Sequence, residues 1–256
     1  MRRFTTVLAA TAVAACLPFL CDTTTGARKP RPTQPPDKPT SHYEKRELRG
    51  WTLRVNKDLL DANHAELYEE VRAELDNHLY RITRVVPAKA LEKLKAVTIW
   101  IELANPKGGN CCYHPGVKWL KEHNYNPDKE NCFEIGSAKG FLRSVKHQPW
   151  LALHELAHGY HDQVLGFDHP KILALYKEAK ESGKYDKVLV WNGREERAYH
   201  MSTPMEYFSE TTEAYFGQND VYPFVKVELK RHDPNMYNLL EELWGVEKKT
   251  RRSKRR

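Results

Sequence analysis

The stretch 150–165 constrains this chain more than any other, because it contains the pattern His-Glu-x-x-His from His154 to His158. On an α-helix, residues four apart lie on one side and one turn apart, so both imidazoles can converge on one metal ion. Glu155 is rotated by about 100° from His154. Its carboxylate therefore lies off the metal but close to a water molecule there, whose proton it can accept. The pattern predicts a helix that carries a zinc site.

The flanking residues favour a helix packed against a core. Apolar side chains recur at spacings of three and four along one face: Trp150, Leu153, Ala157, Tyr160 and Val164. A neighbouring stripe carries His154, His158 and His161. His161 lies two turns beyond His154, roughly 10 Å along the axis, too far to complete the same coordination sphere. We expect it to support a ligand or line the cleft, with an ordinary surface histidine as the alternative.

Two histidines leave a catalytic zinc site one protein ligand short, and the segment 199–217 offers candidates. Thr203 can cap a helix that has Pro204 at its first position and Glu206 at its third. The side chains of Glu206, Glu210 and Glu213 then share one face of that helix. Three like charges on one face are unfavourable unless a cation lies opposite. Any one of the three carboxylates could be the third ligand.

A family resemblance rests on both segments. His154-Glu-Leu-Ala-His158, then Tyr199, six residues, and Glu206-Tyr-Phe-Ser-Glu210 resemble the zinc metallopeptidases related to anthrax lethal factor, which are of gluzincin type. The resemblance covers only the metal helix and the segment 199–217, so substrate class does not carry over.

This resemblance implies a role for each matching residue. Glu206 would be the third zinc ligand, and Glu210 would orient a ligand histidine. Tyr199 would donate its hydroxyl to the tetrahedral intermediate, with His200 as a competitor for that role. The implied activity is hydrolysis of a peptide or protein substrate with one Zn²⁺, and the alternative is a catalytically inactive zincin-like binding protein of the cell envelope.

The apolar patterns predict an α+β fold, and the resemblance implies a zincin-like metallopeptidase domain over residues 50–247, with a small mixed sheet beside the His-Glu-x-x-His helix. The expected strands are 50–55, 97–103, 132–137 and 188–191, and the other expected helices are 61–85, 88–95 and 170–181. The helix at 61–85 has Asp61 as a candidate cap. In zincins the strand before the metal helix often binds an extended peptide along a sheet edge, which suggests this role for residues 133–137, with an ordinary core strand as the alternative.

Both ends of the chain differ from this body. Residues 1–27 have the basic start and apolar run of a secretory signal, which predicts a secreted or periplasmic protein with no transmembrane segment after cleavage. Cleavage after Ala27 is the main expectation, and a lipid anchor at Cys16 is the alternative. The proline-rich segment 28–49 is expected to be a flexible basic linker.

The net charge of +7 lies in these ends, because residues 50–247 carry a net charge of −5. The tail 248–256 has seven Lys and Arg residues and is expected to be disordered. It could bind nucleic acid or an anionic polymer, but we favour a solubilising tail without a specific nucleic-acid partner.

Three cysteines remain after signal cleavage. In an oxidising compartment we expect Cys132 to pair with Cys111 or Cys112 and to close a loop of about 20 residues. Their spacing does not match a zinc knuckle, so the sequence predicts no second metal site.

Overall fold

The main sheet has five strands in the order β1-β2-β3-β5-β4. They are β1 Tyr43–Leu48, β2 Trp51–Asn56, β3 Ile99–Ile101, β4 Cys111–His114 and β5 Cys132–Ile135. β2, β3 and β5 are parallel, whereas β1 and β4 run antiparallel to their neighbours. The computed structural model describes residues 36–105, 107 and 109–247. It shows the expected mixture of α and β structure with a small mixed sheet.

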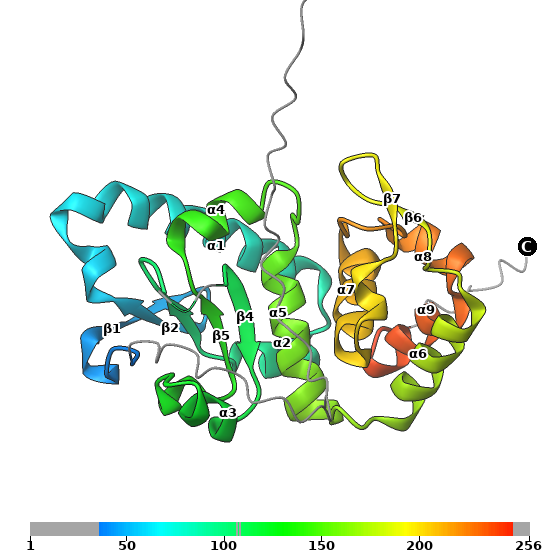
Figure 1. Cartoon of the computed structure of the whole chain (residues 1–256), viewed down its shortest axis with the longest axis horizontal. Coiled ribbons are helices and arrows are strands. Elements are labelled where there is room, and N and C mark those ends of the chain that lie inside the picture. The colour runs from blue at the N-terminus through cyan, green and yellow to red at the C-terminus, as the bar shows by residue number, and fades with distance from the viewer. Residues whose placement is uncertain (1–35, 106, 108, 248–256) are drawn as a thin grey trace, which may run out of the picture.

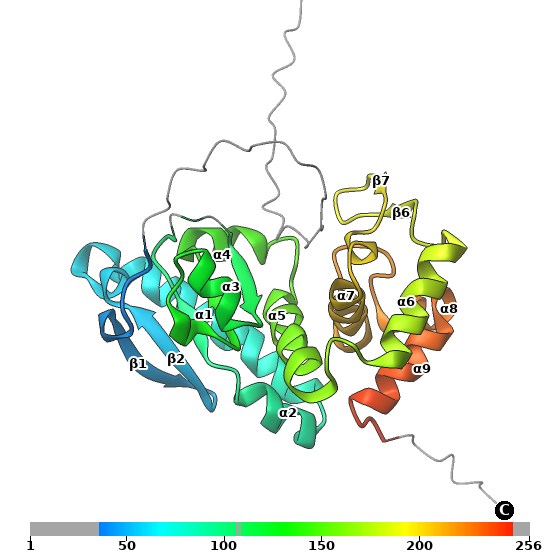
Figure 2. The ribbon, with the colours of Figure 1, turned by 60° about the horizontal axis from the view of Figure 1, so that its bottom comes forward.

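Helices lie on both sides of a central helix, α5 (Figure 1). The helices are α1 Ala65–Val85, α2 Ala88–Lys95, α3 Val117–Glu122, α4 Ala138–Ser144, α5 Leu151–Tyr160, α6 Pro170–Ser182, α7 Pro204–Phe216, α8 Lys226–His232 and α9 Pro234–Leu243. Two views show α5 between the sheet and α7, with α6, α8 and α9 beyond α7 (Figures 1 and 2). Helix α5 therefore joins a sheet-containing half to a helical half.

The two faces of the sheet have different compositions. Leu53, Ile99 and Phe133 lie side by side in register and belong to the main apolar core with α1 and α5. The next residues along, including Trp100 and Glu134, face the other side. There a smaller apolar cluster lies beside buried charged groups. Strand alternation thus separates an apolar face from a polar and aromatic one.

Helix α5 is buried along its whole length, as its apolar pattern predicts. It begins at Leu151 and continues through His161–Leu165 as a π-helix. Gly159 allows a close approach to the sheet, because a Cβ atom there would lie 3.0 Å from Val97 and 3.2 Å from the Tyr113 ring. Helix α5 therefore packs directly against the sheet side of the core.

Several expected elements are confirmed and others shift. The strand expected at 50–55 is β2, the helix at 88–95 is α2, and the helix at 170–181 is α6, which ends at Gly183 in the left-handed conformation. The helix expected from residue 61 begins at Ala65, because a short 3₁₀ turn at Ala62–His64 precedes it. Asp61 is thus not its cap. The strand expected at 188–191 is the shorter β6 Val188–Leu189, which pairs with β7 Glu195–Glu196 separately from the main sheet.

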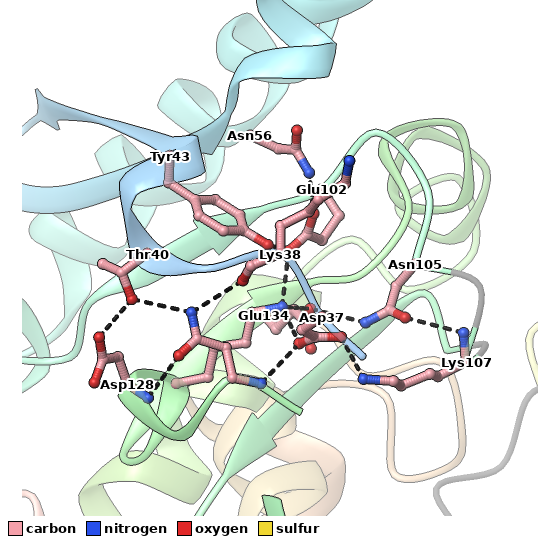
Figure 3. Close-up of polar contacts among 12 residues, drawn as sticks. Asp37, Lys38, Thr40, Tyr43, Asn56, Glu102, Asn105, Lys107, Asp128 and Glu134 are labelled. Atoms are coloured by element: carbon pink, nitrogen blue, oxygen red, sulfur yellow. Dashed lines mark hydrogen bonds and ion pairs between the residues drawn. The ribbon is translucent and has the colours of Figure 1, made fainter. Parts of the chain in front are cut away.

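The fold begins earlier than expected, inside the segment predicted to be a linker. Tyr43–Leu48 forms β1 and pairs with β2 along its length. Before it, Asp37 forms ion pairs with Lys107 and Lys129, and Thr40 donates a hydrogen bond to Asp128 (Figure 3). Residues 37–48 therefore belong to the folded body. The predicted signal peptide, the first part of the linker and the basic tail lie outside the described residues.

The expected disulfide is wrong, because Cys132 is a free cysteine. The register of β4 and β5 places it opposite His114. Cys112 and Cys111 lie two and three residues further along β4, at about 3.3 Å per residue. Their Cα atoms are therefore beyond the roughly 7 Å that a disulfide can span.

The expectation of an edge strand at 133–137 is also wrong. β5 lies between β3 and β4, and β4 is the strand at that end of the sheet. Residues 132–135 are buried, as in an ordinary core strand. Among the described residues, no helix combines the length and apolar character needed to cross a membrane.

Candidate metal centre

Helices α5 and α7 pack against each other and bring together the side chains that the sequence placed 50 residues apart. Nε2 of His154 lies 3.1 Å from Nε2 of His158 and 3.1 Å from Oε2 of Glu206. The third distance, from Nε2 of His158 to Oε2 of Glu206, is 3.5 Å. Three potential donor atoms therefore surround one point.

These distances fit a small tetrahedral ion. Zinc binds imidazole nitrogen and carboxylate oxygen at about 2.0–2.1 Å, which in tetrahedral geometry separates neighbouring ligand atoms by roughly 3.3 Å. The measured 3.1–3.5 Å brackets that value. Two ring nitrogens facing one another are unfavourable when both are lone pairs, and an ion between them removes the conflict. The three side chains thus fit a zinc ion and leave its fourth position to a small ligand.

Local sequence explains the position of Glu206. Thr203 accepts a hydrogen bond from the Glu206 backbone N–H at 3.1 Å, and Pro204 occupies the first turn, as predicted. This cap fixes the start of α7. The Glu206 side chain is then free to turn toward α5, where both histidines lie. The cap therefore fixes the position of Glu206 in the first turn of α7.

The electrostatics of the group are those of a site that attracts a cation. Burial raises the pKa of Glu206, but His158 and a hydrogen bond with His154 outweigh it and hold that pKa well below its usual range. Burial lowers the pKa of His154, yet its contacts with Glu206 and Glu213 raise it well above the ordinary value. The carboxylates around His154 thus favour positive charge at this point, which either a proton or a metal ion can supply.

Glu213, rather than Glu210, contacts His154 directly. Oε1 of Glu213 lies 2.8 Å from Nδ1 of His154 and accepts a hydrogen bond from Gln148 at 3.0 Å. Glu210 approaches the same Nδ1 only to 4.0 Å. The resemblance had implied the orienting role for Glu210, and the structure places Glu213 there. A carboxylate on Nδ1 leaves Nε2 to face the metal point.

His154, Glu210 and Glu213 form a second possible group of donors. It contains one imidazole, and its Glu210 oxygen is the more distant member. Burial, helped by Asp220 and Glu213, raises the pKa of Glu210 well above its usual range. A protonated carboxyl group is a poor metal ligand. The group with His158 and Glu206 is therefore the better metal site.

The two candidates for the oxyanion role differ in exposure. Tyr199 begins a 3₁₀ turn, Tyr199–Met201, that packs against α7, and its side chain is 38% exposed. His200 is fully buried, with its ring against that of Tyr185. Burial lowers the pKa of His200 to about 3. Only Tyr199 is accessible to a substrate.

The two other candidate residues of this helical stretch, Glu155 and His161, are both buried. Glu155 is buried next to His154 on α5. His161 is fully buried between the rings of Phe167 and Phe208, and burial lowers its pKa to about 3. Neither the cleft-lining nor the surface position expected for His161 is observed.

The structure also shows a donor cluster that the sequence analysis missed. Cys112 and His114 on β4 lie beside Glu134 on β5, on the polar face of the sheet. Cysteine spacing alone did not reveal it. Alternation in two strands places these residues on a shared face, and only their register brings them together.

The chain has no match among the family models, the curated proteins or the solved structures with which it was compared.

Proposed function

We propose that this protein is a zinc-dependent metallopeptidase whose ion is held by His154, His158 and Glu206. The observation that carries the proposal is the convergence of their three donor atoms within 3.1–3.5 Å of one another. Three protein ligands and one open position are typical of catalytic rather than structural zinc. Bound zinc would polarise the scissile carbonyl and lower the pKa of a nearby water molecule.

The other residues would move protons and stabilise charge. Glu155 follows His154 on α5, where its carboxylate can accept a proton from the attacking water and pass it to the leaving amine. A structural zinc site has no need of a carboxylate at this position. Tyr199 would donate a hydrogen bond to the carbonyl oxygen as negative charge develops there. Its exposure supports this role over that of His200.

Strand β4 is the best candidate for contacting the substrate backbone. It lies at the end of the sheet, and its only strand partner among the described residues is β5. Helix α5 packs against it. An extended peptide that adds to β4 would form backbone hydrogen bonds with little demand on sequence. This strand takes the role that the sequence had suggested for residues 133–137.

The test is zinc content together with cleavage of a peptide library. Wild-type protein purified without chelator should contain zinc and cleave peptides. Glu155→Gln should keep the zinc and lose most of the cleavage. Glu206→Ala should lose the zinc of this site as well. Glu181→Gln, on the exposed side of α6, is the matched control and should behave as wild type.

Other outcomes would contradict specific parts of the proposal. Wild-type protein without affinity for zinc would refute the metal site. Zinc binding without cleavage of any peptide would favour a zincin-like binding protein instead. Full cleavage by Glu155→Gln would show that another group is the base.

A further inference from the structure

The cluster on the polar face of the sheet lies apart from the α5–α7 site and consists of Cys112, His114 and Glu134. Nε2 of His114 lies 2.6 Å from Oε2 of Glu134 and 3.4 Å from Sγ of Cys112. Sγ of Cys112 and Oε2 of Glu134 are 4.0 Å apart. Glu134 is 1% exposed and His114 4% exposed. A thiol, an imidazole and a carboxylate therefore converge in a largely buried position.

The strand register explains this convergence. Cys112 is directly opposite Glu134, and His114 is two residues further on the same face of β4. Cys111 has Ile135 as its partner and packs against the main apolar core on the opposite face. Of these two adjacent cysteines, only Cys112 can reach the cluster.

The geometry does not suit a nucleophilic relay. In a Cys-His-acid relay, the thiol faces one ring nitrogen and the acid orients the other. Here both Cys112 and Glu134 face Nε2 of His114. Three donors that surround one point are the arrangement expected of metal ligands.

The neighbouring charges support a divalent ion. The other carboxylate oxygen of Glu134 accepts from the ammonium group of Lys129, which is 0% exposed. Lys129 also pairs with Asp37 at 2.9 Å and Glu102 at 2.7 Å (Figure 3 shows Glu102, Glu134 and Asp37). An ammonium group on the second oxygen of a ligand carboxylate is a common way to orient it.

A count of formal charges shows that the cluster can accommodate a divalent ion. The groups in this network are the carboxylates of Asp37, Glu102 and Glu134 and the ammonium groups of Lys107 and Lys129. With a neutral imidazole and thiol, the cluster has one net negative charge. A divalent ion with a thiolate ligand adds one positive charge and neutralises it.

We propose that Cys112, His114 and Glu134 form a second metal site, selective for zinc or another thiophilic divalent ion. On binding, the thiol of Cys112 releases its proton to solvent, and the neutral imidazole of His114 carries its one proton on Nδ1, so that Nε2 can bind the ion beside Glu134. His114 and Glu134 separate slightly, because ligand atoms of a tetrahedral ion are roughly 3.3 Å apart. A water molecule completes the coordination. The sequence alone had predicted no such site.

The site would fix strand β4 to β5. On the other face of β4, the Tyr113 hydroxyl donates a hydrogen bond to Asp162 at 2.8 Å, in the π-helical turn that follows α5. A metal ion at Cys112 and His114 therefore restrains the strand that lies beside the candidate active site. Its role is structural, and the proposal does not depend on peptidase activity.

Cobalt(II) distinguishes the two sites, because only the second one has a thiolate ligand. Metal-free full-length protein under reducing conditions should bind about two equivalents of cobalt, with a near-ultraviolet sulfur-to-cobalt charge-transfer band. Cys112→Ser should lose that band and about one equivalent. Cys111→Ser is the matched control and should keep both. Glu206→Ala should keep the band and lose the cobalt bound at the α5–α7 site. The two sites can therefore be tested independently of each other.

Alkylation of the wild-type protein provides a check that needs no variant. Zinc should slow the modification of Cys112 by a thiol reagent at least tenfold, as mapped by mass spectrometry, and leave that of Cys111 unchanged. A wild-type protein without the charge-transfer band, or a band that persists in Cys112→Ser, would overturn the proposal and leave only a hydrogen bond between His114 and Glu134.

Discussion

A carboxylate contacts each of the two ring nitrogens of His154, and this arrangement gives the two carboxylates different roles. Glu206 lies at its Nε2 and Glu213 at its Nδ1. Both carboxylates come from the same face of α7, one near its start and the other two turns later. The i, i+7 spacing predicted that these residues share a face, but not which nitrogen each would reach. Which nitrogen each carboxylate reaches depends on the antiparallel packing of α5 and α7, and local periodicity does not predict that packing.

The role of Glu213 can be tested by an isosteric change. Glu213→Gln keeps an oxygen near Nδ1 of His154 but removes the negative charge that strengthens that hydrogen bond. Zinc affinity at the α5–α7 site should fall by about tenfold or more, as measured by competition with a chelating dye. Glu210→Gln is the control, because Glu210 is 4.0 Å from the same nitrogen. Equal losses in the two variants would contradict the assignment of Glu213.

Buried histidines predict a loss of stability in acid. Burial, helped by His232, lowers the pKa of His200 to about 3, whereas the unfolded chain has a value near 6.5. Below pH 6.5 the unfolded state therefore binds a proton at His200, whereas the native state binds this proton only near pH 3. The contribution of His200 to the free energy of unfolding is therefore fully present above pH 6.5. Protonation of this group in the unfolded state lowers that free energy by about 2–3 kcal/mol between pH 6.5 and pH 4.5.

The matching measurement is urea unfolding of the chelated protein at pH 7 and pH 4.5. Wild type should lose about 2 kcal/mol more than His200→Leu between these two conditions. For each protein, the free energy of unfolding at pH 4.5 is compared with its own value at pH 7. Any loss of packing energy caused by the substitution is present at both pH values and therefore cancels. An identical pH dependence in both would mean that His200 is protonated in the native state.

At the scale of elements, local signals predict α2, α6 and the cap of α7, because propensity, periodicity and capping act over a few residues. They fail for β1, which lies in a proline-rich and basic segment and forms only by pairing with β2. They fail also for the place of β5, because strand order depends on contacts between distant segments. Local signals also do not predict the cluster at Cys112, because the register of β4 and β5 brings its members together.

The junction of α5 and α7 makes a prediction about a glycine. A Cβ atom at Gly217, just after α7, would lie 1.9 Å from the ring of Trp150, the residue that precedes α5. Gly217→Ala must displace that ring and should reduce the free energy of unfolding by about 1–3 kcal/mol in urea titrations. The displaced Trp150 should also weaken zinc binding by moving the start of α5.

Gly116→Ala is the control for this substitution, because no atom lies within 4 Å of its Cβ position. It should cost less than 1 kcal/mol, a small loss at the N-cap of α3. A Gly217→Ala variant as stable as Gly116→Ala would show that Trp150 can move without cost, and that it does not fix the helix.

At the scale of the whole molecule, the candidate zinc site joins two halves. His154 and His158 lie on α5, which packs against the sheet, and Glu206 lies on α7, which packs with α6, α8 and α9. An ion that binds ligands from both halves binds the native state and not the unfolded one. The metal should therefore stabilise the molecule as a unit.

Thermal unfolding in the Cys112→Ser background isolates the contribution of this site. Zinc at about 100 times its dissociation constant should add about 2.7 kcal/mol to the free energy of unfolding, seen as an upward shift of the midpoint that chelator reverses. Glu206→Ala in the same background should abolish the shift, because the remaining two histidines both lie on α5 and no longer link it to α7. If zinc shifted both proteins equally, the ion would be bound within one half, and Glu206 would not be the ligand that closes the site.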